Sequence, residues 1–299
     1  MTIHITVVPA STQAGTEVIR VLLQSERKPL IRGIYRDLSK VPTEFTQQPS
    51  FEAVKGDVGT GVGLDFSNSN AVFYIPPPTY DGSGQGEFAT RAARNVEDAL
   101  RSAQTVKRLV LHSAMSAQYD HSIGVIRLNH ISDRLLKSAA PEVLIVRPAF
   151  YYETFASALK TMVPERPTFE SPISPASYEF PMVSVQDVGR YCANALLDVS
   201  TWPSFRCVNL FGPRLYSPID VKNAVEAVTG KKCQLITIER EGLADYFAQH
   251  VPQSHVQEFV DMIVALLPGG IAAGDFGYGE DTIRGTAELV DAVRCMLSH

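Results

Sequence analysis

Residues 3–15 read IHITVVPASTQAG, and this stretch decides the fold. Its first six residues form a short apolar run that suits a strand buried on both faces of a parallel sheet. Pro9 ends the run, and residues 16–25 then carry apolar side chains at helical spacing. A buried strand, a short turn and an amphipathic helix form the opening unit of a fold that alternates strands with helices.

The same alternation continues through the N-terminal half of the chain. Further strands are predicted at residues 30–35, 51–55, 71–75, 108–112 and 143–147, and further helices at 88–103 and 131–138. The pattern predicts an α/β fold with a Rossmann-like doubly wound parallel sheet over residues 1–150. Residues 151–299 are predicted to form a smaller α+β substrate domain, with some segments packing back on the sheet. Two stretches, 161–181 and 268–279, are rich in proline or glycine and are predicted to be loops.

Composition excludes several classes of protein. The chain has 299 residues, 45% of them hydrophobic and 20% charged, which is typical of a globular protein. A net charge of −5 argues against binding nucleic acid by phosphate neutralisation. The four cysteines form no close pair, so we expect no metal site, and because no secretory signal is visible we expect reduced thiols. We find no membrane-length apolar run and no secretory leader, so we expect a cytoplasmic protein without a membrane partner.

The turn at residues 9–15 is where a dinucleotide-binding fold places its glycines. Here only Gly15 is present, and Pro9 lacks a backbone N–H. The hydroxyls of Ser11 and Thr12, next to Gln13 at the start of the helix, are candidate donors to a phosphate. The alternative is that this turn binds no nucleotide.

The second predicted strand is followed by two cations, Arg36 and Lys40. A cation just past the second strand is placed to bind the 2′-phosphate of NADP(H), whereas an acidic residue there would favour NAD(H). Asp37 lies beside Arg36, so a solvated basic turn is the alternative. We therefore predict NADP(H) as the cofactor.

The chain resembles the NmrA-like branch of the atypical short-chain dehydrogenases over nearly its whole length. The matching stretches are residues 32–40, 56–58, 72–77, 108–113, 147–150, 181–189 and 210–217. The resemblance implies that Asp57 and Val58 line the adenine, that Pro76 lies by the nicotinamide ribose, and that Ser113 and Pro148 border the cofactor. Some members of this family are NADPH-dependent reductases, including fungal enzymes of secondary metabolism, and others bind NADP(H) and report redox state to a partner protein.

The sequence lacks the Tyr-x-x-x-Lys pair of short-chain dehydrogenases, since Asn129 takes the place of the lysine. His130 is the first candidate for proton transfer, because its ordinary pKa is near neutral. Asp133 lies three residues further on and is predicted to orient the imidazole from the same side of a helix. Tyr119 belongs to a second candidate polar cluster. The alternative for His130 is a surface ion pair or a packed core residue.

An aromatic cluster follows the sixth predicted strand and is a candidate wall for an apolar substrate pocket. Its members, with a methionine from the preceding strand end, are Phe150, Tyr151, Tyr152, Phe155 and Met115. The alternative is that these side chains form the core between domains.

These observations predict an NADPH-dependent oxidoreductase that acts on a hydrophobic, aromatic small molecule of secondary metabolism. One alternative is a redox-neutral isomerase, dehydratase or cyclase in which His130 and Asp133 serve as acid and base. The other is a non-catalytic NADP(H) sensor that binds a regulatory protein. A homodimer is compatible with the sequence.

Overall fold

The computed structural model describes residues 2–155 and 168–297. These residues divide into two compact units. The first unit comprises the chain up to residue 117 together with 128–147 and 188–208, and the second comprises 118–127, the described residues of 148–187 and those from 209 onward. The chain thus crosses between the units several times, and the single boundary predicted at residue 150 is too simple. Residues 188–208 do pack back on the first unit, whereas 118–127 group with the second.

A parallel sheet forms the centre of the first unit. The strands are β1 (His4–Val8), β2 (Leu30–Tyr35), β3 (Phe51–Lys55), β4 (Ala71–Tyr74), β5 (Arg108–His112), β6 (Glu142–Pro148) and β10 (Phe205–Phe211), the last two of which run on into the second unit. Their order is β10-β6-β5-β4-β1-β2-β3, and Val7 of β1 pairs with Gly33 on one side and Phe73 on the other. This arrangement confirms the predicted Rossmann-like fold.

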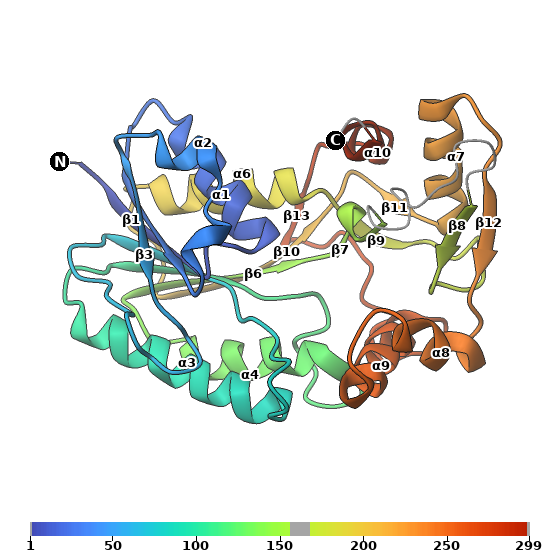
Figure 1. The fold of residues 1–299 in the computed structure, drawn as a ribbon, viewed down its shortest axis with the longest axis horizontal. Helices are drawn as coiled ribbons and strands as arrows, with labels where there is room; N and C mark the ends of the chain where they lie inside the picture. The colour runs from blue at the N-terminus through green and yellow to red at the C-terminus, as the bar shows by residue number, and fades with distance from the viewer. Residues whose placement is uncertain (1, 156–167, 298–299) are drawn as a thin grey trace. The chain divides into compact units, whose positions relative to one another are not determined.

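Helices cover both faces of this sheet (Figure 1). On one face lie α1 (Gln13–Leu23), the short α2 (Thr43–Thr46) and α6 (Val185–Leu197), and on the other lie α3 (Gln85–Ser102) and α4 (Arg127–Leu136). A Cβ on Gly189 of α6 would lie 2.4 Å from Cγ of Glu17 in α1, so glycine permits the close contact of these two helices. The short 3-10 turn η1 (Leu38–Lys40) follows β2.

The predicted strands are confirmed to within one residue at each end. The central strands are buried on both faces of the sheet, and in β4 every residue is buried, whereas the edge strand β3 has no fully buried residue. The helices begin three or four residues before the predicted positions. Hydrophobic spacing marks the buried side of a helix, and the first turns of α3 and α4 contain polar residues that this spacing does not register.

The second unit contains small sheets and helices. The three-stranded sheet β11-β9-β7 is built from β7 (Phe150–Tyr151), β9 (Phe180–Val183) and β11 (Leu215–Tyr216), while β8 (Thr168–Ser171) pairs with β12 (Gln234–Thr237) and β13 (Thr282–Arg284) pairs with the end of β10. The helices are α7 (Pro218–Thr229), α8 (Leu243–Ala248), α9 (Val256–Leu266) and α10 (Leu289–Leu297), and 3-10 turns include η2 (Gly124–Ile126), η3 (Tyr152–Phe155), η4 (Arg240–Gly242) and η5 (Gln253–His255).

The two predicted loops differ in outcome. The segment 268–279 contains no helix or strand, as predicted. Of the segment 161–181, residues 161–167 lie outside the described residues. The remainder contains β8 and the start of β9, so the prediction of a loop there is wrong. Both strands form because they pair with distant segments, β12 and β11, which local composition does not reveal.

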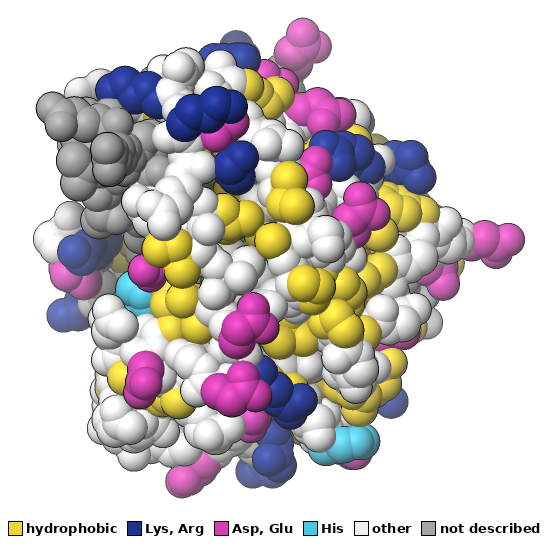
Figure 2. All heavy atoms as spheres, turned by 90° about the vertical axis from the view of Figure 1, so that its right-hand side faces the viewer, with side chains coloured by type: hydrophobic (Ala, Val, Ile, Leu, Met, Phe, Trp, Pro, Cys, Tyr) yellow, Lys and Arg dark blue, Asp and Glu magenta, His cyan; other side chains and the backbone are white. Residues whose placement is uncertain are grey.

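Aromatic side chains fill the core of the second unit. Tyr152, Phe169 and Phe180 are almost completely buried in it. On the face seen in Figure 2, hydrophobic side chains lie among charged side chains of both signs. Ile219 and Ile236 are the large hydrophobic residues of this unit that are exposed among those described.

Candidate functional site

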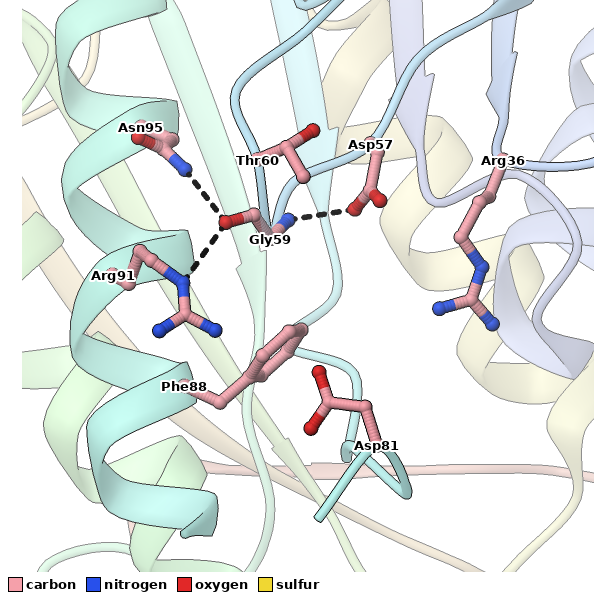
Figure 3. A pocket seen from close by; sticks show the side chains of 8 residues that line it. All are labelled: Arg36, Asp57, Gly59, Thr60, Asp81, Phe88, Arg91 and Asn95. Carbon is pink, nitrogen blue, oxygen red and sulfur yellow. Dashed lines mark hydrogen bonds between the residues drawn. The ribbon is translucent and has the colours of Figure 1, made fainter. Parts of the chain in front are cut away.

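A pocket of about 460 Å³ lies at the carboxyl ends of β2 and β3, within the first unit (Figure 3). It is lined by Arg36, Asp57, Gly59, Thr60, Asp81, Phe88, Arg91 and Asn95. These residues come from the end of β2, the loops after β3 and β4, and α3. Open α/β sheets bind ligands beyond the carboxyl ends of their strands, so this pocket occupies the expected place for a ligand.

The loop after β3 is folded tightly around Asp57. One oxygen of its carboxylate accepts the backbone N–H of Gly59 at 2.8 Å. The side chains of two α3 residues then hold this loop from the outside: Asn95 Nδ2 donates to the Val58 carbonyl at 2.8 Å, and Arg91 Nε donates to the Gly59 carbonyl at 3.0 Å. The second carboxylate oxygen of Asp57 accepts no hydrogen bond from the residues that the structure describes.

Two guanidinium groups face this pocket from different elements (Figure 3). Arg36 is exposed and makes no hydrogen bond or ion pair with any described residue. The guanidinium of Arg91 lies 5.4 Å from the centre of the Phe88 ring. Asp81 brings a carboxylate, whose pKa is lowered to about 2, chiefly by hydrogen bonds from Ser83.

The residues present fit the adenosine end of NADP(H). Carboxylate oxygens accept hydrogen bonds from an amino group such as that of adenine, and Asp57 offers one. An unpaired guanidinium is suited to a phosphate, and Arg36 offers that. Lys40 was predicted to share this role, but it does not line the pocket; it is exposed at the end of η1. Hydrogen bonds from Ser39 lower the pKa of Asp37, and the charge of Lys40 adds to this.

In the turn between β1 and α1, the side chain of Thr12 caps the first turn of the helix. The Thr12 hydroxyl donates to the Pro9 carbonyl at 3.2 Å and accepts the N–H of Gly15 at 3.0 Å, which makes Thr12 the N-cap. The predicted donation from Thr12 to a phosphate is therefore wrong for this conformation, because its hydroxyl proton is already used. Ser11 and Gln13 are exposed beside it.

His130 lies on α4 with its ring fixed by the backbone. Nδ1 lies 3.0 Å from the Ala117 carbonyl oxygen, and a carbonyl only accepts, so Nδ1 carries the proton of the neutral ring. Nε2 is buried and has no hydrogen-bond partner among the described residues. In the neutral ring Nε2 is therefore a buried acceptor whose lone pair is not used by a described residue.

Asp133 does not orient this imidazole. Its Oδ2 accepts from Arg147 Nε at 3.2 Å and from Arg147 Nη2 at 3.0 Å. Burial raises the pKa of Asp133, while Arg147 and the Ser113 hydroxyl oppose the rise. The predicted pairing of His130 with Asp133 is wrong because the guanidinium is the stronger partner for a buried carboxylate.

Residues 1–268 match the model of the NmrA-like family. The chain belongs to this family. No curated protein sequence matches the chain.

Several solved structures share the fold of this NmrA-like chain. Triphenylmethane reductase of Citrobacter sp. is 18% identical with a TM-score of 0.75, and the match covers 100% of both chains. The NADPH-dependent quinone oxidoreductase QOR2 of Escherichia coli, complexed with NADPH, is 13% identical with a TM-score of 0.74 over 99% of this chain and 100% of that chain. NmrA, a negative transcriptional regulator, is 14% identical with a TM-score of 0.70 over 98% and 95%.

The other predicted polar residues of this NmrA-like chain are dispersed. Ser113 and Asn129 are buried in the first unit, and the Ser113 hydroxyl faces Asp133. Tyr119 belongs to the second unit, where its hydroxyl donates to Asp275 at 2.7 Å. This hydrogen bond raises the pKa of Tyr119, so the phenol holds its proton more firmly than usual. Its predicted catalytic role stays a prediction.

The apolar candidates belong mostly to cores. Val58 and Met115 are buried in the first unit, and Pro76 is buried directly after β4. Pro148 is the buried last residue of β6 and belongs to the second unit.

The predicted aromatic wall is partly wrong. Tyr152 packs edge-on against Tyr216 at 5.4 Å, and Phe155 against Phe169 at 4.9 Å, so these two side chains fill the core of the second unit. Phe150 and Tyr151 are half-buried. Their predicted role in substrate binding stays a prediction.

Sequence reasoning missed the α3 side of the pocket. Phe88, Arg91 and Asn95 lie three and four residues apart, which places them along one side of the helix. That spacing was the available signal. Across the described residues, no group of three His, Cys, Asp or Glu side chains is arranged to hold a metal ion. No described helix is both long and apolar enough to cross a membrane.

Proposed function

We propose that this NmrA-like protein is an NADPH-dependent oxidoreductase. The observation that carries the proposal is the exposed, unpaired guanidinium of Arg36 in a pocket at the end of β2. A pocket of this volume falls in the range of small-molecule sites. The adenine amino group would meet Asp57 and the 2′-phosphate would meet Arg36.

The chain's own residues supply a proton donor as well. NADPH, when bound, supplies the hydride. The Nε2 atom of His130 is buried without a partner, and the Ala117 carbonyl fixes the ring through Nδ1. We propose that the ring takes up a proton at Nε2 from water and passes it to the reduced substrate, which returns the ring to the neutral Nδ1–H form.

The substrate class is a hydrophobic molecule with an extended aromatic or quinone-like system. The structures similar to this chain include proteins named as triphenylmethane reductase, quinone oxidoreductase and leucoanthocyanidin reductase. These three names support the class without identifying the substrate.

Cofactor choice is tested by calorimetric titration of NADPH and NADH. Arg36→Ala removes the charge proposed to meet the 2′-phosphate, so NADPH should bind at least about tenfold more weakly while NADH changes little. Arg94→Ala is the matched control, since Arg94 is an exposed arginine of α3 that does not line the pocket. Equal losses for both nucleotides would contradict the assignment of Arg36.

Reduction is tested by following NADPH oxidation with a panel of quinones and triphenylmethane dyes. His130→Gln should lower kcat by about 10²-fold or more with little change in NADPH affinity. Unchanged kcat in this variant would refute the role of His130, and the absence of turnover with every acceptor would refute the reductase.

A second candidate is a non-catalytic NADP(H) sensor. The absence of Tyr-x-x-x-Lys favours it, and the similarity to the fold of NmrA, a transcriptional regulator, is consistent with it. NADPH binding without turnover would favour the sensor over the reductase. The redox-neutral alternative loses its supporting pair, because Asp133 binds Arg147 instead of His130.

A further inference from the structure

We propose that this chain takes its nucleotide affinity mainly from the phosphoadenosine end, with the adenine ring stacked on the Arg91 guanidinium. A 2′-phosphoadenosine that lacks nicotinamide then binds almost as tightly as the complete dinucleotide. This inference rests on the proposed cofactor and deepens it, because it names the part of the ligand that the site recognises.

Three positions of the turn that would bind the pyrophosphate offer it no backbone N–H. Pro9 has no N–H, and the N–H of Ala10 donates to the Ile34 carbonyl at 2.9 Å. The N–H of Gly15 is taken by Thr12. A phosphate that approaches the first turn of α1 must therefore compete with a side chain that already caps it.

The Thr12 side chain also occupies the space above that turn. A Cβ built on Gly15 would lie 2.8 Å from Thr12 Oγ1 and 2.8 Å from the Pro9 carbonyl oxygen. The space left by the missing side chain of Gly15 is therefore occupied by the Thr12 hydroxyl and the Pro9 carbonyl. Close approach of a pyrophosphate needs that room, so the pyrophosphate contributes little to binding.

At the pocket proposed for the adenosine end, by contrast, Arg91 keeps hydrogen-bonding groups that no described residue uses. The Nε bond to the Gly59 carbonyl holds the Arg91 guanidinium, and its two terminal nitrogens make no hydrogen bond with described residues. In Figure 3 these nitrogens lie below Gly59, between it and Phe88. A planar guanidinium held in this way offers a face on which an aromatic base can stack.

Asp81 separates the roles of the two arginines. Its carboxylate is ionised at neutral pH and interacts with the charge of Arg91. Because like charges repel, this carboxylate disfavours a phosphate at Arg91. The uncharged adenine ring is therefore the group suited to Arg91.

The test is calorimetric titration of the full-length protein with 2′,5′-ADP, NADPH and NADH. The expected result is that 2′,5′-ADP binds within tenfold of NADPH. A loss greater than tenfold for the fragment would overturn the inference while leaving NADPH binding, and so the proposed function, intact. Binding of 2′,5′-ADP without binding of NADPH would contradict the proposed function and leave the inference about the phosphoadenosine end intact.

Arg91 is tested by two variants and a control. Arg91→Ala should weaken NADPH, NADH and 2′,5′-ADP by the same factor of about tenfold, because all three contain adenine. Arg91→Lys should show a similar loss, because lysine keeps the positive charge but has no planar guanidinium on which a base can stack. Arg94→Ala should bind like the parent protein. Full affinity in Arg91→Lys, or a loss confined to phosphorylated nucleotides, would show that Arg91 binds charge and would overturn the stacking assignment.

Discussion

Arg108 lies at the start of β5 and is almost completely buried, although it is charged. Its guanidinium donates to Glu142 and to the carbonyls of Ala195, Asp198 and Ser200. Its Cζ lies 3.5 Å from the centre of the Trp202 ring. One side chain thereby ties together the starts of β5 and β6, the end of α6 and the loop after it. In the sequence it is only the first residue of an apolar run.

Arg108→Met should lower the free energy of unfolding by about 3–5 kcal/mol, because it leaves a carboxylate and several carbonyls without their buried donor. Urea unfolding followed by circular dichroism measures the change. Arg101→Met is the control: its partner Glu97 lies one helical turn away and Arg101 is exposed, so the expected loss is below about 0.5 kcal/mol. A loss below about 1 kcal/mol for Arg108→Met would contradict the structural role.

The buried imidazole of His112 makes the stability of the protein depend on pH. Burial lowers its pKa in the folded protein to about 4, whereas an unfolded histidine has a pKa of about 6.5. Between these values the unfolded chain binds the extra proton, so acidification favours unfolding. The free energy of unfolding therefore loses nothing through His112 well above pH 6.5, and at pH 5 it is lower by about 2 kcal/mol.

The measurement is the free energy of unfolding of the parent protein and of His112→Phe from pH 7.5 to pH 5. Phenylalanine keeps an aromatic ring beside Phe73, which His112 meets edge-on at 6.2 Å. The parent should lose more stability than the variant over this range, whatever their difference at pH 7.5. Parallel curves for the two proteins would show that His112 does not titrate in this way.

At the scale of elements, η2 packs on the backbone of α9 through a glycine. Gly124 has a φ of +53°, and a Cβ there would lie 1.8 Å from the Glu258 carbonyl oxygen and 2.5 Å from the Met262 nitrogen. Neither backbone atom can move independently of its helix. The segment 118–127 is thus fixed within the second unit by a contact that only glycine allows.

Gly124→Ala should destabilise the protein by about 3 kcal/mol or more, since it combines an unfavourable φ with a clash against backbone. Gly274→Ala is the control, because a Cβ there meets nothing within 4 Å. Thermal and urea unfolding of both variants measure the difference. Equal stability of the two variants would mean that η2 does not rest on α9 as described.

The elements that sequence predicts well are those whose signal is local. Strands such as β4 are short apolar runs closed by proline, so their ends follow from the sequence. The β8 strand was missed because its evidence is a partner in β12, more than sixty residues away. Helix starts were displaced because the spacing of buried residues does not report the first turn.

The same difference between local and non-local signals explains which residues of the site were predicted. Arg36 was predicted because it follows a strand directly, and a strand end fixes its position on the rim of the sheet. Asp57 was predicted from the resemblance to the NmrA-like family. Arg91 was missed because its position depends on how α3 docks. The predicted donor role of Thr12 and the pairing of Asp133 failed because backbone and Arg147 compete for these groups, and such competition is settled by tertiary structure.

At the scale of the whole molecule, neither unit is a continuous piece of chain. The first unit needs residues 188–208, and these supply most of α6 and the start of β10. Gly189 places α6 directly on Glu17 of α1, and the N–H of Val143 in β6 donates to the Ser204 carbonyl at 3.0 Å. A cut at residue 150 removes these partners from a sheet and a helix that are otherwise buried.

A fragment of residues 1–150 should therefore lack a cooperative unfolding transition, even though it contains every residue that lines the pocket. Loss of α6 removes the helix that packs against Glu17 of α1, and loss of 195–204 leaves Arg108 with Glu142 but without its carbonyl acceptors. Urea titration followed by near-ultraviolet circular dichroism measures this, with the full chain as control. The fragment should also fail to bind NADPH, because Arg36 and Arg91 keep their positions only while β2 and α3 stay docked. A steep, reversible transition in the fragment would show that the continuous N-terminal segment folds by itself, and the boundary at residue 150 would then be a true domain boundary.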